Sequence, residues 1–322
     1  MRRRSMLMAA AATPLLLSIP LTTLARPAVA DDDWRDARRD RTVPVRIRWP
    51  DGDAPCALIV HSHGLGGSRE GGDVWGEAWR QAGFAVLHVQ HTGSDTPVLR
   101  SGMAALRQAA SAAQLQARVA DMQFALDELA RRTQARDSAW SRVRLEAIGA
   151  SGHSFGAVTV QALAGQRFPV AAVGDTEPRF KAFVAFSPSP GQGIAVARGF
   201  AAVTRPFLGL TGTHDSDPLG RGLTGERRTS VFDGLPRGQR ALLWLDGADH
   251  MSFAGNAEPR LRARAGVLKR EPEAAEREPQ HHRLVAAIST LWWRAHLLDD
   301  AQAGAALRAP AGLGSGDRWQ QD

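Results

Sequence analysis

The residue with the clearest chemical potential is Ser154, at the centre of the pentapeptide G-H-S-F-G at positions 152–156. The pentapeptide follows an apolar, strand-like run that ends near Ile148 and precedes a segment with helical spacing of apolar residues. A serine flanked by glycines at such a point is typical of a sharp strand-to-helix turn that exposes the hydroxyl, because larger flanking side chains would collide with neighbouring elements. The N-terminus of the following helix also favours an anionic intermediate. We therefore predict that Ser154 is a nucleophile.

A serine hydroxyl needs a general base, and the base needs a carboxylate to orient it. Asp215 follows the apolar run at 207–210, and His250 follows the apolar run at 241–245. The order serine, aspartate, histidine, with each residue just past a predicted strand, matches one known arrangement of this set. We expect His250 to take the proton of Ser154 while Asp215 fixes the tautomer and stabilises the imidazolium.

Three other carboxylates compete with Asp215 for the orienting role. Asp217 lies two residues further on and could reach the same position, whereas Asp175 precedes the next predicted strand and is a weaker candidate. Asp249 adjoins His250, where a carboxylate caps a loop more often than it faces the imidazole ring.

Donors for an oxyanion are expected in the heptapeptide H-S-H-G-L-G-G at positions 61–67, which follows the apolar run ending at Val60. The backbone amides of Leu65 and Phe155 would converge on the oxygen, and the three glycines let the backbone approach a substrate closely. A phosphate-binding loop is disfavoured because the lysine and the spacing of a P-loop are absent.

A metal site is the second alternative for the heptapeptide, since four imidazoles lie in this part of the chain (His61, His63, His88 and His91). No spacing places them on one centre, so we predict no metal ligands. No cofactor is expected either, because a nucleophile, a base and oxyanion donors suffice for acyl transfer to water.

The substrate pocket is predicted from aromatic residues in or beside loops that follow strands. These residues are Trp75, Phe186, Phe232 and Phe253. Apolar side chains of this kind line clefts for small esters or lipid-like molecules, although they also serve as core or lid packing.

The elements that must position these residues alternate along the chain. Strands are expected at 43–49, 57–60, 84–87, 143–148, 180–186, 207–210 and 241–245, and helices at 75–81, 111–129, after residue 154 and at 284–298. Several strand runs are continuously apolar, as in sheets covered on both faces. The alternation predicts an α/β fold with a mostly parallel, doubly wound sheet and helices on both faces.

Four segments divide the chain. Residues 1–30 combine a basic head, an apolar stretch and the small residues A-V-A, so we predict an export signal, possibly of the twin-arginine type, that is removed after Ala30. Residues 31–42 are expected to be a flexible lead-in, 43–300 one catalytic domain with a charged surface insertion at about 258–280, and 301–322 a disordered tail. The mature protein would be periplasmic or secreted, without a stable membrane span.

Composition excludes several classes of protein. The 322 residues are 43% hydrophobic and 23% charged, which fits a globular core and not a disordered chain. Residues 1–30 hold four of the 40 basic residues and none of the 33 acidic ones, so a net charge of +3 remains after their removal. No basic block interleaved with aromatic residues indicates nucleic-acid binding. The single Cys56 allows no disulfide framework within one chain, and the oligomeric state stays open.

Three segments resemble a known family: residues 61–69 (H-S-H-G-L-G-G-S-R), residues 89–95 (V-Q-H-T-G-S-D) and residues 152–156. They are similar to predicted dienelactone hydrolases and platelet-activating-factor acetylhydrolase-like serine esterases of the α/β-hydrolase superfamily, over most of residues 43–300. The resemblance implies the α/β-hydrolase fold and a serine esterase mechanism.

Two departures from this family bear on specificity. True dienelactone hydrolases use a cysteine nucleophile, and here the position holds Ser154, so lactone specificity is not carried over. In the acetylhydrolases the acid resembles a residue at the end of the strand after the nucleophile helix, near Ser187, where this chain has no carboxylate. The acid is therefore placed one strand later, at Asp215.

The expected function is an exported serine hydrolase that cleaves carboxylic esters through an acyl-enzyme. The same three residues would also serve an acyltransferase or a peptidase. A hydrolase-like scaffold that only binds a ligand or partner is a further alternative, although such scaffolds usually lack one member of the set.

Overall fold

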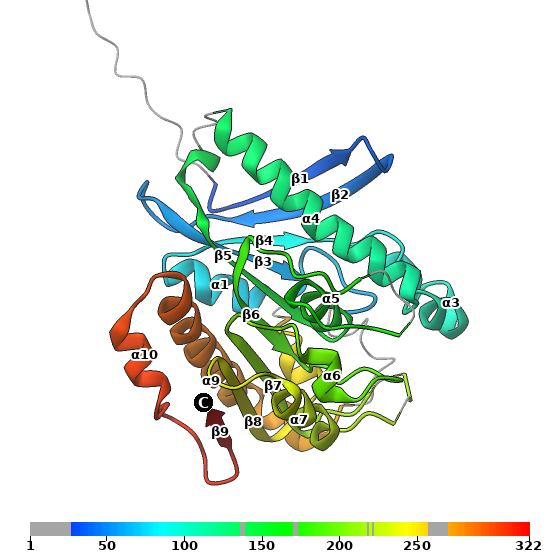
Figure 1. Cartoon of the computed structure of the whole chain (residues 1–322), viewed down its shortest axis with the longest axis vertical. Helices are drawn as coiled ribbons and strands as arrows, with labels where there is room; N and C mark the ends of the chain where they lie inside the picture. Colours follow the sequence, from blue (N-terminus) through cyan, green and yellow to red (C-terminus); the bar gives the residue numbers. More distant parts are fainter. Residues whose placement is uncertain (1–26, 136–138, 170–172, 218, 221, 257–269) are drawn as a thin grey trace, which may run out of the picture.

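One nine-stranded sheet organises the protein in our computed structural model, which describes residues 27–135, 139–169, 173–217, 219–220, 222–256 and 270–322. Its order is β1-β2-β4-β3-β5-β6-β7-β8-β9 (Figure 1). The strands are β1 (Val29–Asp36), β2 (Arg41–Arg48), β3 (Cys56–Ser62), β4 (Ala85–Val89), β5 (Val143–His153), β6 (Phe180–Phe186), β7 (Phe207–His214), β8 (Arg240–Asp249) and β9 (Arg318–Gln321). The six strands from β4 to β8 are parallel, whereas β1–β2, β2–β4 and β8–β9 are antiparallel pairs. The prediction of an α/β protein with a mostly parallel sheet is confirmed.

Helices cover both faces of the sheet, as predicted. They are α1 (Asp73–Gln81), α2 (Thr96–Leu99), α3 (Gly102–Gln108), α4 (Ala112–Gln134), α5 (Phe155–Ala164), α6 (Val196–Phe200), α7 (Gly225–Gly234), α9 (Pro272–Leu297) and α10 (Ala301–Leu307), with short 3-10 helices η1 (Trp140–Arg142) and η2 (His250–Phe253). Successive strand residues alternate between the two layers: Leu58 joins the core beneath α4 and α5, and Ile59 joins the core beneath α1 and α9. Burial on both faces explains why these strands are apolar without interruption.

The lead-in predicted to be flexible at 31–42 is instead the first hairpin of the sheet. Strand β1 pairs with β2 along its whole length, and the Arg46 guanidinium holds the Asp31 carboxylate through two hydrogen bonds of 2.6 and 2.8 Å. Trp34 is fully buried, with its ring centroid 5.4 Å from that of Trp140. That prediction was wrong because a charged strand at a sheet edge can be ordered by one neighbour and a single buried aromatic residue.

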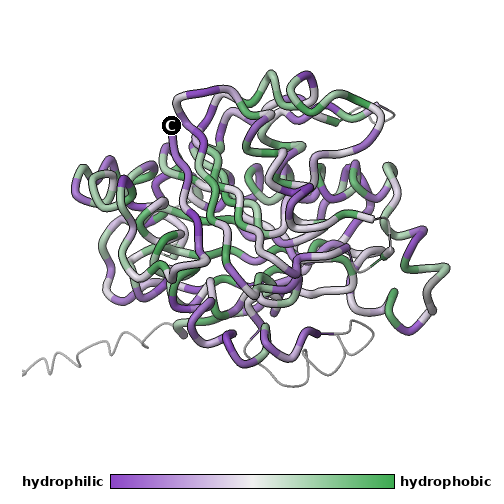
Figure 2. Tube along the Cα trace, turned by 90° about the horizontal axis from the view of Figure 1, so that it is seen from below, coloured by the Kyte–Doolittle hydropathy of each residue, from purple (hydrophilic) through white to green (hydrophobic). Residues whose placement is uncertain are grey.

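The prediction of a disordered tail at 301–322 is also wrong. Helix α10 packs its buried Leu307 into the core beneath α9, and β9 pairs with β8. Figure 2 shows this last strand, mostly hydrophilic, beside the apolar strand β8. The segment R-W-Q-Q lacks the apolar alternation of a typical strand, so its pairing could not be read from periodicity.

Two predictions fall partly on residues that the structure does not describe. The predicted signal peptide lies outside the described residues up to position 26, and β1 begins at Val29, before the predicted cleavage point after Ala30. The charged insertion at 258–280 lies outside up to residue 269, but α9 begins at Pro272, so its second half is helix rather than surface loop. Within the described part of the chain, no helix is both long and apolar enough to cross a membrane.

Candidate active site

The turn that carries Ser154 has the geometry predicted from its glycines. Strand β5 ends at His153, α5 starts at Phe155, and Ser154 between them has φ 56° and ψ −114°. This is a strained backbone region for a residue with a side chain. A Cβ on Gly156 would overlap the carbonyl oxygen of Ser62, and one on Gly152 would overlap the carbonyl of Gly156. Only glycines therefore allow strand, turn and helix to meet this closely.

The structure brings Ser154, His250 and Asp215 together. The Ser154 Oγ lies 2.9 Å from His250 Nε2, and His250 Nδ1 lies 2.7 Å from Asp215 Oδ1. The second carboxylate oxygen of Asp215 accepts a hydrogen bond of 2.9 Å from the Thr211 hydroxyl. Asp215 is fully buried and His250 is nearly so. Each of the three follows the carboxyl end of a parallel strand, which is why residues distant in sequence meet at one edge of the sheet.

Arg228 of α7 holds Asp215, the acid of this hydrogen-bonded set, in place. Its Nε lies 3.1 Å from Asp215 Oδ1 and donates to the Asp215 carbonyl at 3.0 Å. One terminal nitrogen donates to the carbonyls of Ser187 and Pro188, each at 2.9 Å. Burial would raise the pKa of Asp215, but the Arg228 charge and the His250 hydrogen bond lower that pKa to about 2. Asp215 is therefore ionised at neutral pH and holds the imidazole proton on Nδ1, which leaves Nε2 to accept the serine proton.

The competing carboxylates are engaged elsewhere. The Asp249 carboxylate caps η2, where it accepts from the Ser252 amide at 2.8 Å, and it also pairs with Arg270 at 3.0 Å. Asp217 accepts from the Leu219 amide at 3.0 Å, and Asp175 is exposed. Of the four candidates, Asp215 is the one bonded to the imidazole of His250.

The loop after β3 lies against Ser154. A Cβ built on Gly64 would stand 3.5 Å from the Ser154 Cβ, and Leu65 and Phe155 both line the cavity in front of the serine. Among the described residues, neither the Leu65 amide nor the Phe155 amide donates to a protein acceptor. Both amides therefore remain available to an oxygen in the cavity, as the sequence predicted.

His63 prepares the Leu65 amide. Its Nδ1 donates to the Gly64 carbonyl at 2.6 Å, because its Nε2 accepts from the His91 amide at 3.0 Å and so carries no proton. The Gly67 amide donates to the same carbonyl at 3.0 Å. That carbonyl and the Leu65 N–H belong to one peptide unit, so the two hydrogen bonds polarise the N–H and make it a stronger donor.

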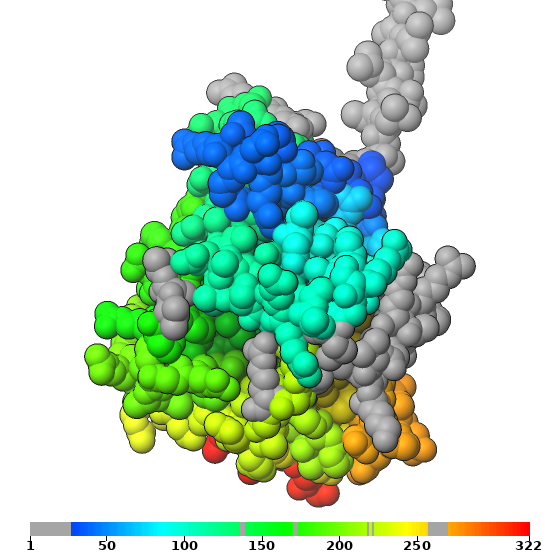
Figure 3. Space-filling model, turned by 90° about the vertical axis from the view of Figure 1, so that its right-hand side faces the viewer, coloured from blue at the N-terminus to red at the C-terminus, as the bar shows by residue number. Residues whose placement is uncertain are grey.

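The cavity in front of Ser154 has a volume of about 440 Å³ and is lined by both apolar and polar side chains. Apolar side chains come mainly from the loop after β3 and from α2 to α5 (Leu65, Leu99, Leu106, Leu115, Phe155, Val158 and Phe168). Polar side chains from α7 and from the segments after β6, β7 and β8 also line the cavity (Ser187, Ser189, Gln192, Asp217, Arg227 and Asn256), and so do the apolar Leu219, Leu223 and Met251 of the same region. Figure 3 shows one face on which the cyan-to-teal surface of the first group lies above the green and yellow surface of the later loops.

The four aromatic residues predicted for the pocket do not line this cavity. Trp75, Phe186 and Phe253 are fully buried in the core beneath α1 and α9, and Trp75 stacks on Phe186 with ring centroids 5.5 Å apart. Phe232 packs instead under the Arg240 guanidinium, 4.4 Å from its ring centroid. This prediction was wrong because these large rings bury their apolar surface against core residues and not in the cavity. The apolar side chains that do line the cavity include Leu115, which the sequence placed on a helix face, and Leu99 and Leu106, for which it predicted no role.

The four histidines considered as metal ligands (His61, His63, His88 and His91) are buried and neutral. Burial lowers the pKa of His61 to about 3 and that of His91 to about 4. His61 contacts the Ser151 hydroxyl at 2.9 Å, and His88 donates to the Gly71 carbonyl at 3.0 Å. In the part of the chain that the structure describes, no three histidine, cysteine or carboxylate side chains form a group that could hold a metal ion.

Two residues of the site were missed by sequence reasoning, and both are buried arginines. Arg118 lies within the apolar face that the prediction gave to α4, three positions after Leu115 and four before Met122. A charge inside an otherwise apolar helix face was the available signal. Arg228 follows another arginine in a short polar helix, and no pattern in the sequence distinguishes it.

Comparisons with known proteins add no name to this arrangement. No family model matches the chain, and no curated protein is significantly similar to it. The function of the site therefore has to be argued from its geometry.

Proposed function

We propose that this protein is an exported serine hydrolase of the α/β-hydrolase fold that cleaves carboxylic esters through an acyl-enzyme on Ser154. The observation that carries the proposal is the hydrogen-bonded chain from the Ser154 hydroxyl through His250 to the ionised Asp215. A serine on a strained strand-to-helix turn, followed along the chain by its acid and then its base, supports the fold assignment.

Acylation begins when Ser154 Oγ attacks the ester carbonyl carbon and its proton passes to His250 Nε2. The carbonyl oxygen becomes an oxyanion, which the amides of Leu65 and Phe155 receive. The tetrahedral intermediate then collapses: the bond to the alkoxy oxygen breaks, the His250 proton goes to that oxygen, and the alcohol leaves. The acyl group remains on Ser154.

Deacylation repeats these steps with water. His250 Nε2 takes a proton from the water, whose oxygen attacks the acyl carbon, and the second oxyanion meets the same two amides. The Ser154 oxygen leaves with the proton held on His250, and the product is a carboxylic acid. His250 acts as base and then as acid in both halves of the reaction.

The substrate is an ester with an apolar portion. The leucines of the α2 to α4 region, together with Phe155 and Val158, give one side of the cavity an apolar surface that favours hydrocarbon over charged groups. Polar residues that line the same cavity, among them Ser189 and Gln192, suit a polar part of the molecule. We infer a small or lipid-like ester, delivered in an extracytoplasmic compartment, as the export signal predicts.

Labelling with a fluorophosphonate tests the proposal directly. One adduct per chain is expected, at Ser154, with none on Ser154→Ala. Turnover of p-nitrophenyl esters with acyl chains of two to sixteen carbons then measures the preference of the cavity. A folded wild-type protein that neither labels nor hydrolyses any ester of the series contradicts the proposal.

The alternative functions separate in the same assay. Ester products formed with added alcohols indicate an acyltransferase, and cleavage of matched anilides at rates near those of the esters indicates a peptidase. A scaffold that only binds ligand shows no covalent labelling.

A further inference from the structure

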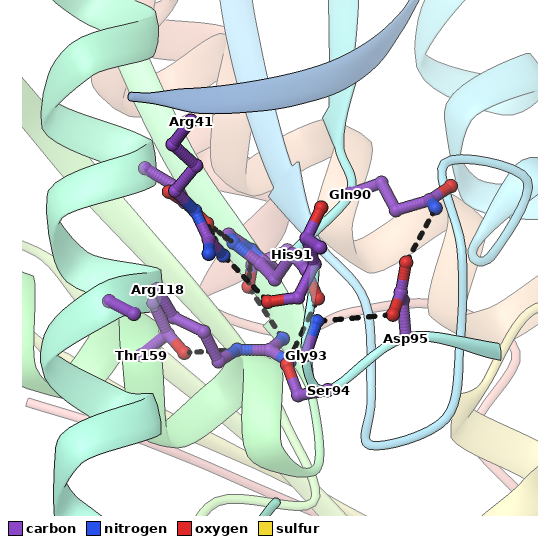
Figure 4. A network of polar contacts seen from close by, with 12 residues as sticks. Arg41, Gln90, His91, Gly93, Ser94, Asp95, Arg118 and Thr159 are labelled. Atoms are coloured by element: carbon purple, nitrogen blue, oxygen red, sulfur yellow. Dashed lines mark hydrogen bonds and ion pairs between the residues drawn. The ribbon is translucent and has the colours of Figure 1, made fainter. Parts of the chain in front are cut away.

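Arg118 is a fully buried cation without a directly bound carboxylate. Its three nitrogens donate to neutral oxygens: Nε to the Thr159 hydroxyl at 3.0 Å, and the terminal nitrogens to the hydroxyls of Ser94 at 2.9 Å and Ser62 at 3.1 Å, and to the His63 carbonyl. Among the described residues, no carboxylate oxygen lies within ion-pair distance of it. Figure 4 shows the guanidinium with Thr159 on one side and Ser94 on the other.

The carboxylates nearest to Arg118 serve other groups. Asp121, one turn further along α4, accepts from Arg39, Arg41 and His91. Asp95 accepts from the Gln90 amide at 2.8 Å and the Gly93 backbone at 3.3 Å. Burial lowers the pKa of Arg118 to about 9, so the group still carries its charge at neutral pH. The fold thus retains a desolvated positive charge in a place where an apolar side chain would be less costly.

The Arg118 guanidinium contacts both segments that carry the expected oxyanion donors. The guanidinium carbon lies 4.7 Å from the centroid of the Phe155 ring, and the Phe155 amide is one of the donors. The His63 carbonyl that Arg118 binds lies two residues before Leu65, whose amide is the other. Thr159, which Arg118 also binds, is one turn along α5 from Phe155. One guanidinium therefore ties together the two segments that carry the amides.

We propose that Arg118 is a positioning residue for the oxyanion, which fixes the Leu65 and Phe155 amides relative to each other and adds a positive charge that has no carboxylate within ion-pair distance among the described residues. The inference rests on the proposed serine hydrolase activity. A cation held in a low-dielectric interior stabilises negative charge that develops on the carbonyl oxygen more than it stabilises the neutral ester. Its effect is therefore expected on kcat rather than on KM.

A matched pair of substitutions at Thr159 tests the charge while Arg118 stays in place. Thr159→Asp sets a carboxylate against the guanidinium, and Thr159→Asn sets an uncharged group of the same shape there. Relative to Thr159→Asn, we expect Thr159→Asp to lower kcat about 10-fold or more at unchanged KM, with a thermal midpoint that is equal or higher because the buried cation is now paired. Equal kcat values in the two variants overturn the electrostatic part of the proposal.

A second pair of variants tests Arg118 itself. Arg118→Lys keeps the charge and loses the fork, whereas Arg118→Met keeps most of the volume and loses both. We expect kcat to fall about 10- to 100-fold in Arg118→Met and clearly less in Arg118→Lys, with KM within about 3-fold of wild type. Unchanged kcat in Arg118→Met, or a change in KM alone, would show that Arg118 only fills space, and equal kcat losses in both variants would remove the role of its charge.

The inhibition constants of two ketones test the role of Arg118 even if a variant has low stability. A trifluoromethyl ketone adds the Ser154 oxygen to its carbonyl carbon, passes the serine proton to His250 and leaves an anionic oxygen, whereas the matching methyl ketone stays largely neutral. The inhibition constant of the former should rise in Arg118→Met in proportion to the loss of kcat/KM, while that of the latter should not. Parallel changes for both ketones overturn the proposal.

Failure of this inference is distinguishable from failure of the proposed function. Wild-type protein that labels at Ser154 and hydrolyses esters, together with variants of unchanged kcat, removes the role of Arg118 alone. Absence of labelling and turnover in the wild type removes both.

Discussion

The described residues include two hydrogen-bonded Asp–His–Ser chains, one ending at Ser154 and the other at Ser62. In the first, Asp215 Oδ1 is 2.7 Å from His250, and His250 is 2.9 Å from Ser154. In the second, Asp121 Oδ2 is 3.1 Å from His91, and His91 is 2.9 Å from Ser62. Residue types and distances alone therefore do not make a serine reactive.

The two serines differ in conformation and in surroundings. Ser154 lies on a turn with positive φ and lines the cavity, whereas Ser62 is fully buried in β3. The Ser62 oxygen also accepts a hydrogen bond of 3.1 Å from Arg118. This bond occupies a lone pair that the oxygen would need for attack on a carbonyl carbon. Exposure and a free lone pair separate a reactive chain from a structural one.

The buried arginines stand at opposite ends of the two chains. Arg228 contacts the aspartate of the first chain, and Arg118 contacts the serine of the second. The first cation holds a carboxylate that orients the base. The second cation donates to the serine at the end of its chain and to the His63 carbonyl, in the segment that carries the Leu65 amide.

The largest expected effect comes from removing the two hydroxyls in turn. Ser154→Ala should lower kcat by about 10⁴-fold or more and abolish fluorophosphonate labelling, because it removes the nucleophile. Ser62→Ala should keep the label and lose no more than about 10-fold in kcat, through a loosened Arg118. Mass spectrometry of the adduct with initial rates checks both, and a label on Ser62 would reverse the comparison.

The carboxylates should separate activity from stability. Asp215→Asn should cost about 10⁴-fold in kcat with a small effect on folding, because the wrong tautomer of His250 is held. Asp121→Asn should lower the free energy of unfolding by about 3–5 kcal/mol, because it leaves Arg39, Arg41 and His91 without their shared carboxylate. Urea unfolding and steady-state kinetics on both variants measure the split; a larger kinetic loss in Asp121→Asn would contradict it.

The histidine of the structural chain should make the fold sensitive to acid. The unfolded chain protonates a histidine near pH 6.5, whereas burial keeps the pKa of His91 at about 4, so the unfolded state binds the proton first and stability falls as pH drops through this window. His91→Gln should reduce that slope by up to about 1.4 kcal/mol per pH unit. Unfolding free energies at several values between pH 7.5 and 4.5 provide the measurement. The surface variant His214→Gln is the control, and equal slopes in wild type and His91→Gln would refute the assignment.

The smallest expected effect concerns the second oxygen of the catalytic carboxylate. Thr211→Val removes the 2.9 Å hydrogen bond to Asp215 and should lower kcat about 5- to 10-fold, the equivalent of one typical hydrogen bond. Thr213→Val, on the same strand but bonded to the surface residue Asp246, is the matched control. Similar kinetics in the two variants would mean that Thr211 does not orient the acid.

The sequence was most informative where chemistry and topology coincide. Ser154, Asp215 and His250 each follow a strand of a parallel sheet, so the order of strands was enough to expect them at one edge. Most of the six parallel strands were predicted because burial on both faces makes their sequences largely apolar.

Other features depend on contacts that no local pattern encodes. The edge strands β1 and β9 are polar, and each is held by pairing with a single neighbour. The pocket was misassigned because the packing of Trp75 and Phe186 in the core depends on α9, which lies about 200 residues further along the chain than Trp75. Arg118 was visible as a charge on an apolar helix face, but its partners come from distant segments.

The N-terminal hairpin has a consequence for maturation. Ala30 pairs with Ile47, and the Trp49 amide donates to the Ala28 carbonyl at 2.8 Å, so the predicted scissile bond after Ala30 lies inside a paired strand. A peptidase binds its substrate as an extended chain with free backbone groups, and here those groups are already used. If the predicted cleavage after Ala30 takes place, it would have to precede the pairing of β1 with β2 or follow the detachment of β1.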